Sequence, residues 1–334
     1  MLIVGFRGSV LDAGDPIAVA LAAGLGGVIL FDRDQTTGGA RNIRSPAQLR
    51  ALTDSVRALA PGHVFIAIDQ EGGVVSRLDP SRGFPKTRSQ ASIGRTDDPA
   101  VARAAGRAMG ETMAAAGIDL DLAPVVDVNV DPNNPAIGAF GRRFSADPTT
   151  VAAFADAEIR GLHEAGIRAA IKHFPGLGSA AANTDFVVVD VTDTWTDAEL
   201  QPYETLIGLD APDAIMVANL VDRHLDPRLP ASLSPAIVNE LLRRRLGWTG
   251  AVVTDDLGAV AITARFKRAE AVALAIEAGN DLLLFANQAT YVPDLARRLT
   301  DTIVALVRSG RISESRIDGS IVRLDALAGR PATG

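Results

Sequence analysis

The stretch 167–185 (IRAAIKHFPGLGSAAANTD) places several chemically reactive side chains close together. An apolar run delivers Lys172 and His173 side by side, and a glycine-rich loop then leads to the polar residues 183–185. Many α/β enzymes present reactive groups in this way, at the end of a buried strand and on the loop that follows it. The stretch therefore indicates a functional site, and a site for a sugar is the first hypothesis.

Polar residues also follow other apolar runs that are typical of strands. Each one has an ordinary explanation, since an aspartate can cap the next helix, a lysine and a histidine can end a solvated strand, and glycines after an aspartate can form a turn. Five strand ends in succession favour one shared site over five coincidences. These ends carry Asp69, Asp127, Lys172 with His173, Asn219, and Asp255 with Asp256.

The types of residue present limit the chemistry. Several carboxylates, a lysine, a histidine and the arginines Arg77, Arg142 and Arg143 suit a polyhydroxylated or anionic ligand. The four histidines are scattered without metal-ligand spacing, so no metal or other cofactor is indicated, and His63 and His163 are expected at the surface. The chain has no cysteine and no G-x-S-x-G motif, which leaves carboxylate chemistry on a glycoside.

Short apolar runs alternate with longer segments of helical period, which predicts parallel strands covered by helices. Eight such repeats favour a closed (β/α)8 TIM-type barrel over an open doubly wound sheet, and no dinucleotide-binding G-x-G-x-x-G turn follows the first strand. One catalytic barrel domain over 1–330 and a frayed tail over 331–334 are expected. The predicted strands are 2–6, 27–31, 64–68, 119–123, 167–171, 214–218, 251–254 and 281–285. The predicted helices are 15–24, 46–60, 97–117, 148–165, 197–209, 235–246, 266–279, 292–309 and 314–328, and the second of them begins with Ser45 as N-cap and Pro46.

The composition is that of a soluble globular protein, with 334 residues, 47% hydrophobic and 22% charged. A net charge of −7 offers no broad basic surface, so nucleic acid is not an expected partner. No apolar run of about 18 residues occurs, so no membrane span is expected. The first residues are too short an apolar run for a secretory signal, which favours a cytoplasmic protein, although a chain trimmed of a signal or lipoprotein anchor would have the same sequence.

Five motifs in this order make the sequence specific enough to compare with a family. Together they resemble the catalytic barrel of glycoside hydrolase family 3, in its single-barrel β-N-acetylhexosaminidase branch, and the resemblance covers nearly the whole chain. The motifs are IAIDQEGGVVSRL, APVVDVNVDPNNPAIG with RRFSADP, KHFPGLG, PASLS and VVTDDLGAVAI.

The resemblance implies a role for particular residues. Asp255 matches the family's catalytic nucleophile, so Asp256 is expected to cap the following helix. The residues that match sugar-binding positions are Asp69, Arg77, Arg142, Lys172 and His173. The chemistry agrees, because nearby cations keep a nucleophilic aspartate ionised.

The sequence departs from the family in the loop after KHFPG. An Asp-Ser-His triplet, whose aspartate and histidine form the acid/base dyad, is replaced by Asn183, Thr184 and Asp185. In a first interpretation Asp185 is itself the acid/base, with a pKa raised by a desolvating loop beside Asp255. In a second the acid comes from elsewhere or the substrate needs an activated leaving group, and in a third the barrel binds sugar without efficient hydrolysis.

The predicted function is a retaining exo-β-N-acetylglucosaminidase that hydrolyses terminal β-linked amino sugars of cell-wall-type fragments. It would act by double displacement through a covalent glycosyl-Asp255 intermediate, with a carbohydrate as its only implied partner. The alternatives are a β-glucosidase or β-xylosidase of the same family and a sugar-binding barrel with weak or lost catalysis. A lyase or aldolase that uses Lys172 as a Schiff base is more remote.

Overall fold

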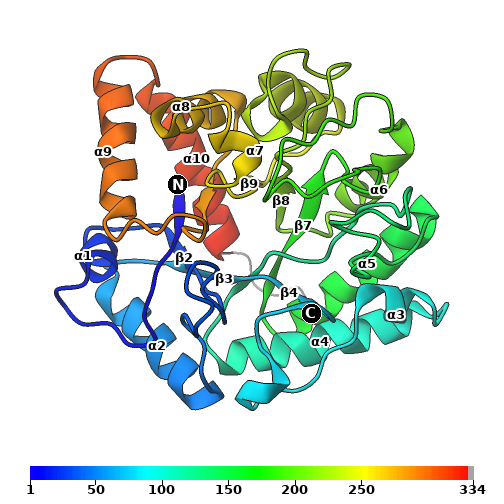
Figure 1. Cartoon of the computed structure of the whole chain (residues 1–334), viewed down its shortest axis with the longest axis horizontal. Coiled ribbons are helices and arrows are strands. Elements are labelled where there is room, and N and C mark those ends of the chain that lie inside the picture. The colour runs from blue at the N-terminus through cyan, green and yellow to red at the C-terminus, as the bar shows by residue number, and fades with distance from the viewer. Residues whose placement is uncertain (330–334) are drawn as a thin grey trace.

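The computed structural model describes residues 1–329, and the tail predicted at 331–334 lies outside this range. Its centre is a parallel sheet of eight strands in the order β10-β1-β2-β3-β6-β7-β8-β9, ringed by helices (Figure 1). The strands are β1 (Leu2–Gly5), β2 (Gly27–Ile29), β3 (Phe65–Ile68), β6 (Leu120–Asp121), β7 (Arg168–Phe174), β8 (Ala214–Val217), β9 (Ala251–Thr254) and β10 (Leu283–Phe285).

The sheet closes on itself between its first and last strands. A parallel bridge joins Val253 to Leu282, and the Thr254 N–H donates to the carbonyl oxygen of Leu282 at 2.9 Å. Every ladder between neighbouring strands is parallel. The predicted (β/α)8 barrel is therefore confirmed.

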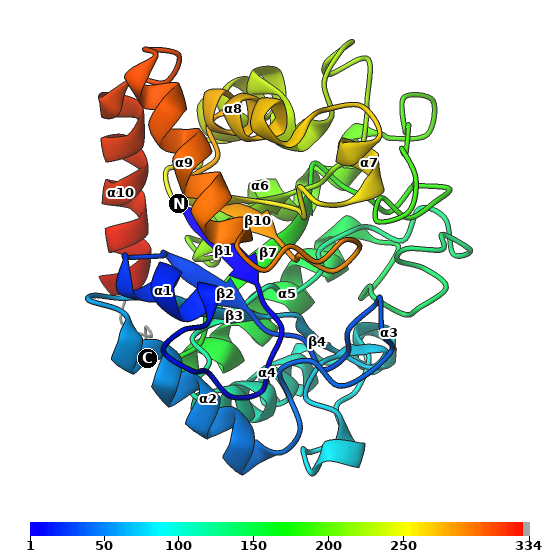
Figure 2. The same ribbon diagram turned by 60° about the vertical axis from the view of Figure 1, so that its left-hand side comes forward.

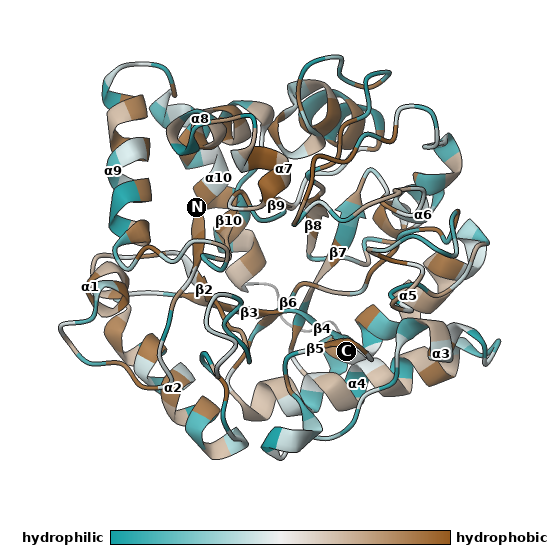
Figure 3. Cartoon of the chain, viewed as in Figure 1, coloured by the Kyte–Doolittle hydropathy of each residue, from teal (hydrophilic) through white to brown (hydrophobic). Residues whose placement is uncertain are grey.

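The period-two alternation of the strands divides the apolar residues into two cores. Ile3, Ala67 and Ala170 belong to the cluster inside the barrel, whereas Val4 and Ile66 belong to the larger cluster between strands and helices. Figure 3 shows β1 and β10 in hydrophobic colours, while helix α9 carries both hydrophobic and hydrophilic residues. The barrel is thus filled with side chains, and any ligand must bind at one of its ends.

Within residues 1–329, ten α-helices surround the sheet. Ser45 and Pro46 begin the second helix as predicted, because the Gln48 N–H donates to the Ser45 hydroxyl at 3.3 Å. The helices are α1 (Pro16–Ala22), α2 (Pro46–Leu59), α3 (Gln90–Gly94), α4 (Pro99–Ala115), α5 (Pro148–Glu164), α6 (Gln201–Gly208), α7 (Val260–Thr263), α8 (Arg268–Ala278), α9 (Leu295–Arg308) and α10 (Glu314–Gly329).

The last helix covers the end of the barrel where the strands begin. Leu324 and Leu327 of α10 pack into the cluster inside the barrel, and the Arg168 guanidinium donates to the carbonyl oxygen of Leu327 at 2.6 Å. Figure 2 shows α10 standing beside α9. Because this end is closed, the opposite end, where the strands finish, is the one open to a ligand.

Several predicted elements differ in detail. The helix predicted over 235–246 is a π-helix, η4 (Ala236–Arg245), and the one over 197–209 is divided into a short 3₁₀ turn, η2 (Asp197–Glu199), and α6. The strand predicted over 119–123 is only two residues long in β6. The remaining elements are 3₁₀ turns η1 (Pro80–Arg82) and η3 (Ala231–Leu233), and an antiparallel hairpin of β4 (Gln70–Gly72) and β5 (Val75–Ser76).

Candidate active site

The strand ends surround a cavity of about 340 Å³. Residues at or after the ends of β2, β3, β6, β7, β8, β9 and β10 form its walls, as expected for the active end of a barrel. All seven residues predicted as site residues line this one cavity. They are Asp69, Arg77, Arg142, Lys172, His173, Asp185 and Asp255.

Lys172 is a buried ammonium group held between two carboxylates. Its Nζ lies 2.7 Å from Asp69 Oδ1 and 2.7 Å from Glu71 Oε1. Burial alone would lower the pKa of Lys172, but the charges of Asp69 and Glu71 outweigh it and raise the pKa above its ordinary value. Lys172 is therefore protonated, which does not suit the nucleophilic amine of a Schiff-base enzyme.

Glu71, which belongs to the DQEGG motif, is a site residue that was not predicted from the sequence. It accepts two hydrogen bonds from the Arg142 guanidinium, at 2.7 and 2.8 Å, in addition to its contact with Lys172. Burial would raise the pKa of Glu71, but Arg142 and Lys172 hold it well below its usual range. The charged array at the base of the cavity is thus ionised and fixed, and the conjunction of Glu71 with Asp69 in DQEGG was the available signal.

The Asp69 carboxylate also points toward Arg77, whose Nη2 lies 3.8 Å from Asp69 Oδ2. Although burial opposes it, the attraction of Lys172 and Arg77 keeps the pKa of Asp69 below its ordinary value. An ionised carboxylate is an acceptor for the hydroxyl groups of a sugar. Asp69, Arg77 and Lys172 together offer both acceptors and donors along one wall.

His173 is oriented by a carboxylate that lies behind it. Its Nδ1 is 2.7 Å from Asp127 Oδ2, and its backbone N–H donates to Asp127 Oδ1 at 3.2 Å. Because a carboxylate accepts only, this contact assigns the ring proton to Nδ1 and leaves Nε2, 3.4 Å from Arg142 Nη2, on the cavity side. Asp127 is fully buried and does not line the cavity, so its strand-end position serves to orient His173.

Asp255 and Asp256 follow β9 and both line the cavity. Asp255 Oδ1 accepts the N–H of Asp256 at 2.7 Å. Asp256 Oδ1 accepts the N–H groups of Gly258 at 2.8 Å and of Ala286 at 3.0 Å, which ties the end of β9 to the end of β10. Asp256 is not the predicted helix cap, because α7 begins at Val260 with Ala259 as its N-cap.

Burial raises the pKa of Asp256 to about 7, and the negative charges of Asp255 and Asp185 add to the effect. Asp256 therefore makes its backbone contacts with a carboxyl group that is neutral below about pH 7. The other carboxyl group at this strand end is that of Asp255.

The loop that carries Asp185 is docked on the segment after Asp255. The carbonyl oxygens of Thr184 and Asp185 accept the N–H groups of Ala261 and Val260 at 3.2 Å each. Asn183 Oδ1 accepts the N–H of Asp185 at 2.8 Å, so the asparagine stabilises the loop backbone. Desolvation and the charge of Asp255 raise the pKa of Asp185, whose side chain keeps some exposure to solvent, in the direction that a general acid requires.

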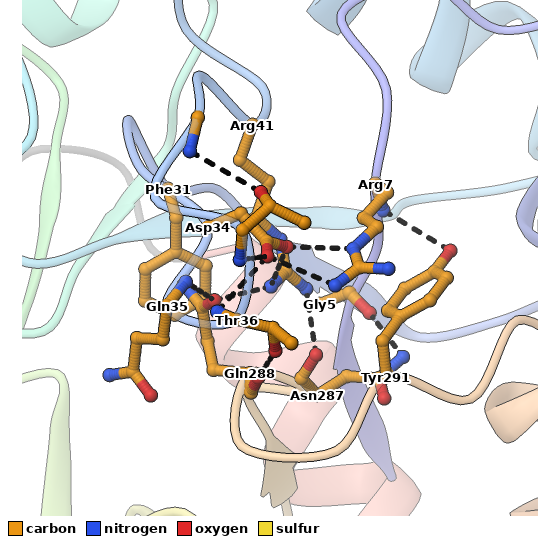
Figure 4. A network of polar contacts seen from close by, with 12 residues as sticks. Gly5, Arg7, Phe31, Asp34, Gln35, Thr36, Arg41, Asn287, Gln288 and Tyr291 are labelled. Atoms are coloured by element: carbon orange, nitrogen blue, oxygen red, sulfur yellow. Dashed lines mark hydrogen bonds and ion pairs between the residues drawn. The ribbon is translucent and has the colours of Figure 1, made fainter.

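A second wall of the cavity comes from the loops after β2 and β10, which Figure 4 shows joined by a polar network. The fully buried guanidinium of Arg41 donates to the carbonyl oxygens of Phe6 at 2.8 Å and Ala286 at 3.0 Å. Asp34 accepts from Arg7 at 2.7 Å, and Gln288 accepts the N–H of Gln35 at 3.0 Å. The network joins the β1, β2 and β10 ends into one rigid rim.

Some polar residues of the sequence do not reach the cavity. Asn219 is buried and donates to the carbonyl oxygen of Asp256 at 2.8 Å, so it supports the β9 turn. Arg143 does not line the cavity either. His163, expected at the surface, is largely buried and lies 2.6 Å from Asp213 Oδ2. Within residues 1–329, no group of three or more potential ligand side chains could hold a metal ion.

A closed barrel with carboxylates, cations and a histidine at its open end defines the class of α/β-barrel enzymes. A profile of the "Glycosyl hydrolase family 3 N terminal domain" matches residues 17–327. The chain belongs to glycosyl hydrolase family 3, which confirms the resemblance indicated by the motifs.

Two relatives illustrate the similarity in sequence. A beta-hexosaminidase of Alkalilimnicola ehrlichii is 37% identical over 286 residues, which cover 83% of this chain and 78% of that protein. The beta-hexosaminidase LpqI of Mycobacterium tuberculosis is 35% identical over 340 residues, which cover 98% of this chain and 81% of that protein.

Two solved structures illustrate the similarity in fold. A beta-N-acetylhexosaminidase from Beutenbergia cavernae has a TM-score of 0.86 at 33% identity, covering 98% of this chain and 96% of that one. A family 3 beta-N-acetylglucosaminidase from Paenibacillus has a TM-score of 0.89 at 33% identity, and this chain spans 62% of its length.

Among residues 1–329, none of the helices has the length and apolar character that a membrane span requires.

Proposed function

We propose that the chain is a retaining exo-β-N-acetylglucosaminidase that removes terminal β-linked amino sugars by double displacement. The observation that carries the proposal is the presence of two aspartates, Asp255 and Asp185, on one cavity, with the pKa of Asp185 raised by desolvation and by the charge of Asp255. A retaining glycosidase needs such a pair, one ionised nucleophile and one protonated acid.

In the first step, Asp255 attacks the anomeric carbon while Asp185 gives its proton to the glycosidic oxygen of the leaving group. In the second step, ionised Asp185 takes a proton from water as that water attacks the same carbon and releases Asp255. Two inversions give net retention. Asp69, Arg77, Arg142, Lys172 and His173 would hold the hydroxyl groups of the sugar through the donors and acceptors described above.

The preference for an N-acetylated amino sugar rests on the relatives. The relatives from Alkalilimnicola ehrlichii and Mycobacterium tuberculosis are beta-hexosaminidases. The solved structures from Beutenbergia and Paenibacillus are a beta-N-acetylhexosaminidase and a beta-N-acetylglucosaminidase. Fragments of cell-wall type are the substrates that the family resemblance suggests. A cavity of about 340 Å³ is at the small end for ligand sites, which suits a single terminal sugar.

Hydrolysis of a chromogenic N-acetylglucosaminide, compared with the matching glucoside and xyloside, tests the proposal. We expect the N-acetylglucosaminide to be the best substrate and Asp255→Ala to lower kcat by at least about 10³-fold. Faster hydrolysis of the glucoside or xyloside would contradict the specificity. Sugar binding without turnover of any substrate would identify a binding barrel instead.

A further inference from the structure

A tight turn at 173–178 begins the loop that carries Asp185, and two buried carboxylates hold this turn from different elements. Asp127 Oδ1 accepts the N–H of Leu177 at 2.8 Å. Glu199 Oε2, which comes from η2, accepts the N–H of Gly178 at 2.7 Å. Asp127 also orients His173 and thus belongs to the sugar site, whereas Glu199 does not line the cavity.

Glu199 is a costly residue to bury at this position. Its side chain is fully buried, and among residues 1–329 only the N–H of Gly178 and the polar groups of Ser179 offset the loss of hydration of its carboxyl group. An isolated buried carboxyl destabilises a fold unless its contacts offset the loss of hydration. Burial raises the pKa of Glu199 to about 7, which reflects the same loss. A hydrophobic side chain would avoid this cost, so the carboxyl group indicates a role that needs its acceptor oxygens.

The loop backbone is packed directly on this side chain. A Cβ atom added at Gly176 would lie 2.6 Å from the Glu199 Cβ, and one added at Gly178 would lie 3.2 Å from Glu199 Oε2 and 1.6 Å from the carbonyl oxygen of Val128. Only glycine lets the chain pass between Glu199 and Val128. The path of the loop after Gly178 is thus set by contact with Glu199.

We propose that Glu199 is a positioning residue for Asp185. The segment 178–185 is held at its first end by Glu199 at the Gly178 N–H and by Asp131 and Asn134 at the Gly178 carbonyl oxygen, and at its far end by the N–H groups of Val260 and Ala261. Losing Glu199 removes the attachment of the Gly178 N–H, and Asp185 then samples positions from which proton transfer fails. The proposal rests on the function proposed above, in which Asp185 is the acid/base.

The test compares Glu199→Ala and Glu199→Asp with wild type on two chromogenic N-acetylglucosaminides, one with an activated leaving group and one with a poor leaving group. Aspartate keeps the charge but is too short by one methylene to reach Gly178, so it replaces the alanine variant if that one fails to fold. We expect kcat on the poor leaving group to fall by about 10- to 100-fold with little change in KM. Added azide should restore turnover of the activated substrate, because azide needs no general base.

Two variants serve as controls. Glu199→Gln keeps an acceptor oxygen for Gly178 and should stay within about threefold of wild type. Tyr203→Phe removes a hydroxyl that is buried nearby and has no hydrogen-bond partner among residues 1–329, so it should be neutral. The role of Glu199 would be overturned if the wild type is active but the alanine variant loses kcat equally on both substrates and does not respond to azide. A wild type inactive on every glycoside would overturn the proposed function as well.

Discussion

Asp185 is the residue on which the proposed acid/base chemistry depends. Its backbone is held by α7 and Asn183, and its carboxyl group shares a cavity with Asp255. A carboxyl group can act as the general acid only if it is protonated at the working pH. The pKa of Asp185 is raised in that direction, because desolvation and the charge of Asp255 both disfavour ionisation.

The pH dependence of hydrolysis should therefore report Asp185. Since the acid must be protonated, kcat/KM on a substrate with a poor leaving group is expected to fall as pH rises through the raised pKa of Asp185. A substrate with an activated leaving group needs no proton and should lose this basic limb. Rate profiles for wild type and Asp185→Ala would check the assignment. An unchanged basic limb in the variant would show that another group supplies the proton.

At the scale of elements, the strand that closes the barrel depends on a single buried carboxylate at its start. Asp281 accepts from Arg243 at 2.7 Å, Arg323 at 2.9 Å, Ser320 at 2.6 Å and the N–H of Val252 at 3.0 Å. These partners come from η4, α10 and β9. Asp281 thus joins both helices to the point where β9 and β10 meet.

Asp281→Ala should lower the free energy of unfolding by about 3–5 kcal/mol, because the partly buried arginines lose their counter-charge. Denaturant unfolding measures this loss. Glu240→Ala, which breaks the exposed pair of Glu240 with Arg244, is a matched control and should change stability little. Equal stability of the two variants would contradict the structural role of Asp281.

The sequence predicted elements better than it predicted which way their side chains face. Runs of apolar residues located all eight strands and the polar positions at their ends, because burial on both faces is visible in composition. The sequence placed Asn219 and Asp127 at the correct end of the barrel. It could not tell which face of the strand end each side chain occupies, and both side chains support the site without lining the cavity. The β4–β5 hairpin was missed because it is only a few residues long and interrupted by glycines, and the contacts of Glu71 depend on it.

At the scale of the whole molecule, the active end is built over buried acids that lie between the sheet and the helices. Asp121 follows Leu120 in β6 and is fully buried, and burial raises its pKa to about 8. Glu158 of α5 is also fully buried, with its pKa raised well above the ordinary value by burial and by Asp121. Between about pH 4 and pH 8, Asp121 is therefore neutral in the folded protein where it would be ionised in the unfolded chain.

This difference predicts how stability depends on pH. For a carboxyl whose pKa is raised by folding, the stabilisation is complete below the unfolded pKa of about 4 and is lost as pH rises through about 8. Asp121→Asn removes the ionisable group. It keeps an acceptor oxygen for the Gln70 N–H, which lies 2.9 Å from Asp121 Oδ1 in the wild type. The variant should gain stability relative to wild type as pH increases from about 5 to about 9. If the variant and the wild type differ by the same free energy of unfolding at both pH values, the prediction is contradicted.

Asp255 and Asp185 are proposed to carry out a double displacement. The most direct measurement is turnover of an activated N-acetylglucosaminide by Asp185→Ala with and without azide, with the anomeric configuration of the product determined by NMR. We predict that azide accelerates the variant and that the product is the β-glycosyl azide, because the sugar is transferred from Asp255 with net retention. A variant that does not respond to azide, or that yields the α-azide, would contradict the account.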